Sequence, residues 1–212
     1  MKTVLCYGDS LTWGYDAGGP GRHAYENRWP SALQRALGNN VRVVAEGLNG
    51  RTTAFDDHLA DADRNGARIL PTLLATHAPL DLVVILLGSN DMKPFICGRA
   101  IGAKQGMERL VEIVRGLAYP LEAAAPHVLI VSPPPLSATD NADFDAMFDG
   151  GIGESQKLAG LYAALADELG CGFFDAGGVA ETTPLDGVHL DAANTRAIGE
   201  ALAPVVRVML EL

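Results

Sequence analysis

A serine near the start of the chain stands where a nucleophile can act. Ser10 follows the apolar run Val4–Tyr7 and is preceded by Gly8 and Asp9. An apolar run that ends at a glycine is typical of a buried strand, and the serine hydroxyl is then presented at the carboxyl end of that strand. A serine in this position is a candidate nucleophile if a base and an oxyanion site lie within its reach.

The candidate base lies near the other end of the chain. His189 follows Asp186 by three residues, across a turn that contains Gly187. An imidazole can accept the serine proton near neutral pH. The aspartate can hold that imidazole in one tautomer and stabilise the imidazolium. Ser10, Asp186 and His189 are therefore the predicted catalytic residues of an acyl-transfer site.

Three groups are candidate donors to the oxyanion that acyl transfer creates. They are the backbone N–H of Ser10, the backbone N–H of Gly50 and the side-chain amide of Asn90. Gly50 has no side chain, so its amide can approach a substrate closely. Each residue also has a simpler interpretation, since Ser10 can cap the next segment, Asn90 can be a turn residue and His189 can lie in a surface turn. Their occurrence together favours the catalytic interpretation.

Five short apolar runs predict the strands that position these residues. The runs are Thr3–Tyr7, Val41–Glu46, Leu82–Leu87, His127–Ser132 and Cys171–Phe174. Segments with helical spacing follow them, over residues 29–37, 69–76, 107–117, 158–165 and 197–209, and Asp191 is a candidate N-cap of the last. This alternation predicts an α/β fold with a five-stranded parallel sheet between two helical layers, as a single domain over residues 1–212. Ligands of such folds bind at the carboxyl ends of the strands, where the candidate residues gather.

Composition limits the partners of the protein. The 212 residues carry a formal net charge of −10, which argues against a broad basic surface for nucleic acid or anionic membranes. No apolar run approaches the roughly 18 residues that span a bilayer. The three cysteines, Cys6, Cys97 and Cys171, suit free thiols in a reducing compartment, with Cys6 and Cys171 buried. The amino terminus lacks the pattern of a signal peptide, and we expect a cytoplasmic protein.

Four sequence blocks resemble those of the SGNH (GDSL) hydrolase family. The blocks are Gly8-Asp9-Ser10-Leu11, Gly50 in the loop after the second strand, Gly88-Ser89-Asn90-Asp91, and Asp186-x-x-His189. They run in the family's order over nearly the whole chain. The stretches GDSLTWG, GLNGRTT, LPTLLATHAPLDLV, SPPPL and DGVHL are similar, more narrowly, to the arylesterase/acyltransferase branch. That branch often has Ala where this chain has Gly50 and Ser where it has Asn49.

The resemblance implies a flavodoxin-like fold and ester hydrolysis through an acyl-serine, with no metal and no cofactor. Members of the branch transfer acyl groups to alcohols or peroxide, and some assemble as oligomers, so a homo-oligomer is expected. Because the donor at Gly50 is a backbone amide, its role should survive the departure from the branch pattern. The different residues at positions 49 and 50 are expected to change the rigidity of this loop and the preference for the acyl group.

Five further residues are predicted to line the substrate pocket. They are Asp9, Trp13, Pro134, Phe144 and Phe148. Asp9 can instead brace the serine loop, and Trp13 can pack beneath it. Phe144 and Phe148 lie with Met147 in a long loop, as a wall or lid of the site or as a subunit interface, and the resemblance favours the interface.

The predicted function is a serine esterase that hydrolyses small acyl esters, such as aryl or short-chain acetates, with water as the usual acceptor and alcohol or peroxide as competitors. The expected partner is a small-molecule ester. One alternative is a carbohydrate acetylesterase that uses the same residues. Another is a non-catalytic flavodoxin-like binding module, which would have no need of Ser10, Asp186 and His189. Phosphate binding is disfavoured, because the loop after the first strand lacks both glycine-rich phosphate motifs.

Overall fold

The computed structural model describes residues 1–19, 21–120 and 123–212, and a parallel sheet lies at its centre. In this part of the chain the strands are β1 (Lys2–Gly8), β2 (Val41–Gly47), β3 (Leu82–Leu86), β4 (His127–Ser132) and β5 (Gly172–Asp175). All neighbours pair in parallel, in the order β2-β1-β3-β4-β5. The predicted strands are confirmed, with ends that differ by at most one residue.

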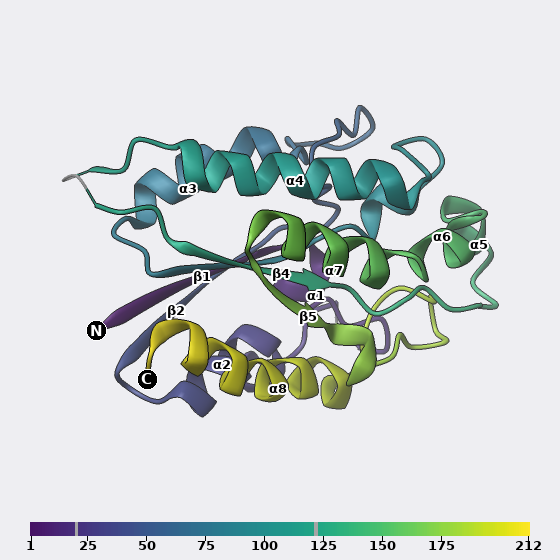
Figure 1. Cartoon of the computed structure of the whole chain (residues 1–212). Helices are drawn as coiled ribbons and strands as arrows, with labels where there is room; N and C mark the ends of the chain where they lie inside the picture. The colour runs from purple at the N-terminus through teal and green to yellow at the C-terminus, as the bar shows by residue number, and fades with distance from the viewer. Residues whose placement is uncertain (20, 121–122) are drawn as a thin grey trace.

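Helices cover both faces of the sheet (Figure 1). On one face lie α3 (Gly66–His77), α4 (Ala100–Gly116) and α7 (Leu158–Leu169), and on the other α2 (Trp29–Leu37) and α8 (Ala192–Leu210). The Asp191 side chain caps α8 by accepting from the backbone N–H of Asn194 at 2.8 Å. The predicted three-layer α/β/α fold is confirmed.

The core is divided by the sheet because successive side chains of a strand point to opposite faces. In β1, Leu5 and Tyr7 pack with the helices of the first face, whereas Val4 and Cys6 pack with Trp29 and others on the second. All four β1 side chains are fully buried. Strands covered on both faces must be apolar throughout, which is why they read as continuous apolar runs.

The strand order fixes where a ligand site can form. The chain leaves β1 for β2 on one side and returns to β3 on the other, so the loops after β1 and β3 diverge and leave a crevice between them. Gly8 at the end of β1 is paired with Leu86 at the end of β3. Ser10 follows the first of these strands and Asn90 the second, so the topology brings both to one crevice.

Three short helices lie at the same end of the sheet and were not predicted. These are α1 (Ser10–Trp13), α5 (Ala142–Met147) and α6 (Gly151–Ser155). In Figure 1, α5 and α6 lie at the right-hand end, beyond the carboxyl ends of the strands. Helices of four to six residues are too short to show a helical repeat of apolar residues, and the segment around α5 and α6 was therefore expected to be a loop.

Two expectations from composition can be compared with the structure. Among the described residues, no helix combines the length and the apolar character needed to span a bilayer. All three cysteines are free thiols, and Cys6 is buried as expected. Cys171 is only partly buried, contrary to the prediction, because it precedes the edge strand β5, where the Arg115 guanidinium reaches its sulfur at 3.3 Å.

Candidate active site

The serine is held at the end of β1 by a tight strand-to-helix turn. Ser10 is the first residue of α1, and the Asp9 carboxylate caps this helix by accepting from the Leu11 N–H at 2.9 Å. A side chain at Gly8 would overlap Thr12 and the carbonyl oxygen of Leu86. Only glycine therefore lets α1 fold back so closely on the strand, and Ser10 is left 6% exposed.

The structure brings the base to this serine from 179 residues away. His189 Nε2 lies 2.9 Å from Ser10 Oγ, and His189 Nδ1 lies 2.6 Å from Asp186 Oδ2. The other carboxylate oxygen of Asp186 accepts from the backbone N–H groups of Val188 at 3.0 Å and His189 at 2.9 Å. These distances are those of a nucleophile, a base and an orienting carboxylate joined in one hydrogen-bonded chain.

The turn between Asp186 and His189 requires glycine. Gly187 adopts a φ of +73°, and a side chain there would overlap the carbonyl oxygen of Ser137. The backbone N–H of Ser137 also donates to the carbonyl oxygen of Gly187 at 2.9 Å. The loop after β4 therefore supports the turn that carries the base.

Electrostatics determine which ring nitrogen of His189 carries the proton. Burial raises the pKa of Asp186, but the hydrogen bonds from the His189 ring and from the backbone of His189 outweigh it, and the net effect lowers that pKa. Asp186 is therefore an acceptor at neutral pH, and Nδ1 of His189 is the donor. Nε2 is left without a proton in the neutral ring and faces the hydroxyl of Ser10 as an acceptor.

The three candidate oxyanion donors border one cavity. Ser10, Gly50 and Asn90 all lie on its wall. Gly50 has a φ of +83°, so the backbone conformation itself favours glycine there. The side-chain Nδ2 of Asn90 donates to the carbonyl oxygen of Arg51 at 3.2 Å and lies 3.4 Å from Asp9 Oδ2, which fixes the amide beside the serine.

This cavity has a volume of about 150 Å³, and its wall includes the apolar side chains of Phe144, Met147, Phe148 and Val188. Its lining residues are Ser10, Tyr15, Asn49, Gly50, Asn90, Lys93, Phe144, Met147, Phe148, Val188 and His189. Phe144 and Phe148 of the predicted pocket residues are among them, and their rings stack with centroids 6.3 Å apart. The ring of Phe144 also meets the imidazole of His189 edge-on, at 5.8 Å between centroids. A cavity of this size suits a small acyl ester.

Three of the predicted pocket residues lie elsewhere. Trp13 is absent from the cavity lining, and its ring packs against the guanidinium of Arg22 at 4.2 Å. Pro134 is buried near the start of the loop after β4, against Gly177. Asp9 is buried behind the serine, where it caps α1 and contacts Asn90. The bracing interpretation of Asp9 is therefore the one that its contacts favour.

Sequence reasoning missed Tyr15, Lys93 and Val188, which also line the cavity, and assigned no pocket role to Asn49. Met147, expected with Phe144 and Phe148 to form a wall, a lid or an interface, lines the cavity as well. Lys93 lies three residues after Asn90, in a loop already identified as facing the ligand, so its position was an available signal. Tyr15 lies in a glycine-rich segment with no pattern that points to a site. Val188 sits between Asp186 and His189, and its role in the wall depends on the conformation of that turn.

A buried polar layer beneath the cavity ties its loops together. Asp91 accepts from the backbone N–H of Thr53 at 3.1 Å and from the Thr53 hydroxyl. Arg51 donates to the carbonyl oxygen of Gly8 at 2.7 Å, and its guanidinium lies over the ring of Tyr7 at 4.1 Å. Burial raises the pKa of Asp9 and that of Asp91 to about 6, and it lowers the pKa of Arg51. This layer joins the loops after β1, β2 and β3.

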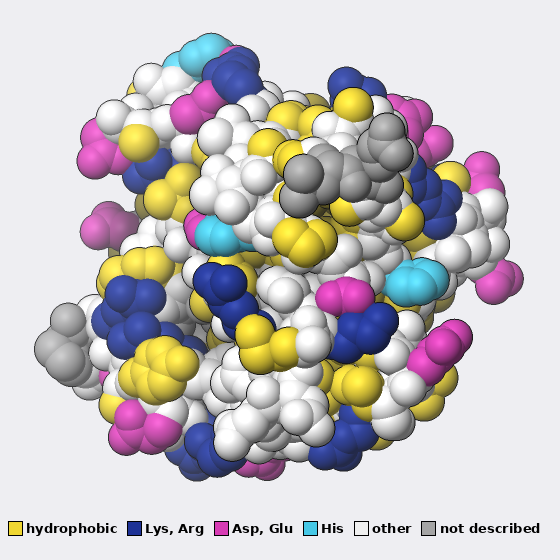
Figure 2. Space-filling view, turned by 90° about the vertical axis from the view of Figure 1, so that its left-hand side faces the viewer, with side chains coloured by type: hydrophobic (Ala, Val, Ile, Leu, Met, Phe, Trp, Pro, Cys, Tyr) yellow, Lys and Arg dark blue, Asp and Glu magenta, His cyan; other side chains and the backbone are white. Residues whose placement is uncertain are grey.

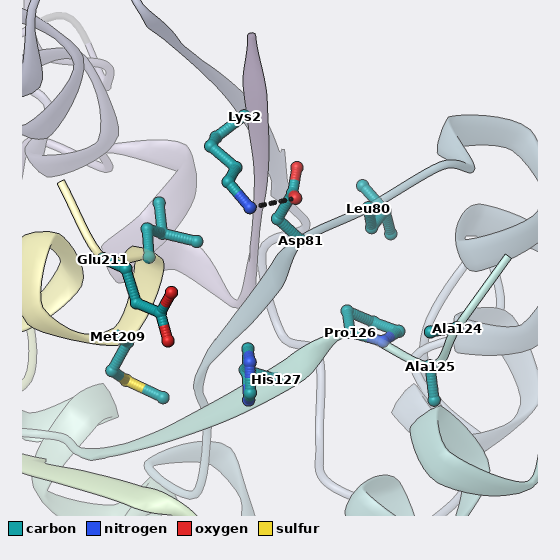
Figure 3. A pocket seen from close by; sticks show the side chains of 10 residues that line it. Lys2, Leu80, Asp81, Ala124, Ala125, Pro126, His127, Met209 and Glu211 are labelled. Atoms are coloured by element: carbon teal, nitrogen blue, oxygen red, sulfur yellow. Dashed lines mark ion pairs between the residues drawn. The ribbon is translucent and has the colours of Figure 1, made fainter.

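A larger hollow, of about 230 Å³, lies at the opposite end of the sheet. Figure 2 shows this end of the molecule, where hydrophobic, basic and acidic side chains are interspersed. Figure 3 shows the hollow itself, with Lys2 paired to Asp81 at 3.0 Å and the His127 ring nearby. Among the described residues that line it, no serine or threonine lies beside that histidine, so its size does not make it a rival for the acyl-transfer site.

Acidic residues also gather around a surface hollow between β2 and α3. The Arg68 guanidinium pairs there with Asp56 at 2.8 Å and with Asp63 at 3.0 Å. Over residues 1–19, 21–120 and 123–212, no three His, Cys, Asp or Glu side chains are grouped so as to hold a metal ion.

Comparisons with known proteins agree with this geometry. A chain described as a carbohydrate acetylesterase family member from Sinorhizobium meliloti is 69% identical, with a TM-score of 0.99 and full coverage of both chains. The aryl esterase of M. smegmatis is 44% identical, with a TM-score of 0.94 and coverage of 99% of this chain and 100% of that one. An acetylxylan esterase of Xylanibacter ruminicola is 24% identical over 96% of this chain. This chain spans 43% of the length of that curated relative.

The sequence model of the GDSL-like lipase/acylhydrolase family matches residues 6–197, a range that contains Ser10, Gly50, Asn90, Asp186 and His189. The predictions of an SGNH-type fold and of a carboxylic ester hydrolase are confirmed by this match and by the esterases of similar structure. The chain therefore belongs to the GDSL-like lipase/acylhydrolase family.

Proposed function

We propose that this protein cleaves small acyl esters, acetates above all, through an acyl-Ser10 intermediate. The observation that carries the proposal is the hydrogen-bonded chain Ser10–His189–Asp186, which opens on a cavity of about 150 Å³. The acyl group would lie in this cavity against Phe144 and Phe148. The small volume favours short acyl chains over long ones.

In the first half of the reaction, Ser10 Oγ attacks the carbonyl carbon of the ester while its proton passes to His189 Nε2. The carbonyl oxygen becomes an oxyanion, for which Ser10 N–H, Gly50 N–H and Asn90 Nδ2 are the proposed donors. The carbon–oxygen bond to the alcohol then breaks, and the imidazolium gives its proton to the departing oxygen. The products at this stage are the free alcohol and acyl-Ser10.

In the second half, water attacks the acyl carbon and His189 Nε2 accepts its proton. The bond to Ser10 Oγ then breaks, the serine regains the proton, and the acid is released. Asp186 stabilises the imidazolium at both stages without taking a proton itself. An alcohol or peroxide can replace water as the acceptor, and the apolar side chains of Phe144, Met147 and Phe148 favour such competition.

The alcohol part of the substrate distinguishes an arylesterase from a carbohydrate acetylesterase. Both would present the same acetyl group to Ser10. Two relatives, the carbohydrate acetylesterase family member and the acetylxylan esterase, support acetylated carbohydrate as a second candidate substrate. Comparing an aryl acetate with acetylated xylo-oligosaccharides, by kcat/KM, decides between them.

The central test is a panel of 4-nitrophenyl esters of increasing acyl length, with and without a serine-directed phosphonate. We expect the highest kcat/KM for the acetate ester. We also expect complete inhibition when one phosphonate is bound per chain, and peptide mass spectrometry should locate that phosphonate at Ser10. The variant Ser10→Ala should lose at least about 10³-fold in kcat while its circular dichroism spectrum is retained. Turnover of the folded variant at a rate near that of the wild type would overturn the proposal.

A further inference from the structure

Among the described residues that line the cavity, Lys93 is the one lysine or arginine. It follows the short turn Asn90–Met92 at the end of β3 and lines the same cavity as Ser10 and His189. The residue is only 9% exposed. Its ammonium group lies 5.5 Å from the centre of the Phe148 ring and 6.0 Å from that of Phe95. The cation therefore lies near two aromatic rings, on a residue that borders the space that the substrate would fill.

The ammonium group has no partner among the described residues. No carboxylate oxygen lies within 4.0 Å of Nζ there, and no oxygen accepts a hydrogen bond from it. The other three lysines of the chain, by contrast, each pair with a carboxylate: Lys2 with Asp81, Lys104 with Glu168 and Lys157 with Glu154. The most enclosed lysine is thus the one that the protein leaves unpaired.

An unpaired cation in such a place is costly to the folded protein. Burial lowers the pKa of Lys93, although the carboxylates of Asp57 and Asp9 act in the opposite direction from a distance. The aromatic rings attract the cation, but they do not offer the oxygen lone pairs that accept N–H hydrogen bonds. A carboxylate that enters the cavity would supply both the missing negative charge and the missing acceptors.

We propose that Lys93 binds a carboxylate carried by the substrate away from the reacting ester bond, and that the enzyme therefore prefers anionic esters to neutral ones. This inference rests on the proposed function, since it assigns the substrate class of the same site. The carboxylate can belong to the acyl group, as in a half-ester of a dicarboxylic acid, or to the alcohol, as in an acetylated sugar acid. The chemistry at Lys93 is the same in both.

Two matched pairs of esters separate these sources. For the alcohol side, 4-acetoxybenzoate is compared with 4-acetoxybenzamide. For the acyl side, the 4-nitrophenyl monoester of glutaric acid is compared with that of glutaramic acid. Each pair differs by a carboxylate against an uncharged amide of nearly the same shape. At pH 7 we expect kcat/KM to favour the carboxylate by about tenfold or more in one of the two pairs, the scale of a hydrogen bond to a charged group.

Variants of Lys93 test whether that preference belongs to this side chain. Lys93→Met keeps the length of the chain without its charge, and it should bring the ratio of kcat/KM for the anionic and neutral esters close to one. Lys93→Arg should retain a preference for the anion. Lys2→Met is the matched control, because it removes the same charge at the opposite end of the sheet, and its ratio should equal that of the wild type.

A measurement on the wild type covers the case in which Lys93→Met does not fold. Benzoate should inhibit hydrolysis of a neutral acetate competitively at lower concentration than benzamide does. Equal inhibition, a ratio near one in both ester pairs, or a preference that persists in Lys93→Met would each overturn the inference. Phosphonate-sensitive turnover of the neutral esters would then still support the proposed function, whereas its absence would count against that function instead.

Discussion

The ring of Tyr15 lies against the imidazole of His189, with the ring centroids 4.1 Å apart and the planes inclined by 34°. Tyr15 lies two residues after the end of α1, and its backbone N–H donates to the carbonyl oxygen of Ser10 at 3.0 Å. The segment that carries the nucleophile therefore also covers the base. Because Asp186 holds one edge of the imidazole and Tyr15 covers its face, the ring has little freedom to turn away from Ser10.

We expect the variant Tyr15→Ala to lower kcat by roughly two- to tenfold, because an aromatic pair contributes about 0.5–1.5 kcal/mol. Tyr15→Phe should stay close to the wild type, since it retains the ring. Steady-state kinetics with 4-nitrophenyl acetate, together with the pH dependence of kcat, measures the effect. A loss in Tyr15→Phe as large as that in Tyr15→Ala would show that the hydroxyl matters and that stacking does not.

Asn90 is predicted to act on the transition state and not on substrate binding alone. Its Nδ2 carries two hydrogens. One is held by the carbonyl oxygen of Arg51 at 3.2 Å, and the other makes only the long 3.4 Å contact with Asp9, so this second hydrogen can turn to a developing oxyanion. Asn90→Ala should cost about 2.7–4 kcal/mol of transition-state stabilisation, seen as a fall in kcat. Single-turnover kinetics of acylation is the direct measurement. A change confined to KM would contradict the role.

The positions of the strands along the chain and the chemistry of the site could be predicted from the sequence, because both depend on local patterns. A strand covered on both faces is a continuous apolar run, and parallel strands end at one edge of the sheet. Ser10 and His189 could therefore be assigned to the same edge although nothing local connects them. The hydrogen bond between their side chains agrees with that assignment.

The cavity wall could not be predicted in the same way, because it depends on which strands are neighbours. Pro134 follows β4, which lies two places from β1 in the sheet, and the sequence does not reveal that order. Trp13 lies three residues after Ser10 in the same helix, yet Arg22 from a distant part of the following loop covers its ring. Lys93 and Tyr15 reach the cavity through loop conformations that carry no repeating pattern.

Phe144 is predicted to limit the length of the acyl chain. It lies in α5, stacks on Phe148 and meets the His189 ring edge-on, so its side chain occupies space beside the reacting groups. Phe144→Ala should raise the ratio of kcat/KM for butyrate to that for acetate by about tenfold, on the scale of a methylene group fitted into an apolar pocket. A 4-nitrophenyl ester series measures this ratio. An unchanged ratio would place the acyl group elsewhere in the cavity.

Asp9 is predicted to make the protein less stable as the pH rises. Burial raises the pKa of its carboxyl from 3.8 to about 6, although the backbone N–H of Leu11 and the charge of His189 act to lower it. Between these two values the folded protein holds a proton that the unfolded chain has released. The contribution of Asp9 to stability is therefore greatest below about pH 4 and is lost as the pH rises to about 6, with a slope of up to about 1.4 kcal/mol per pH unit.

The variant Asp9→Asn removes this titration and still offers an oxygen to the Leu11 N–H. Urea unfolding at pH 4.5, 5.5, 6.5 and 7.5 should show the free energy of unfolding of the variant rising relative to that of the wild type as the pH increases. The difference between the two proteins is the proper measure, because Asp91, whose pKa burial also raises to about 6, gives the wild-type curve a slope of the same sign in this pH range. A difference independent of pH would mean that Asp9 is ionised in the folded protein throughout this range.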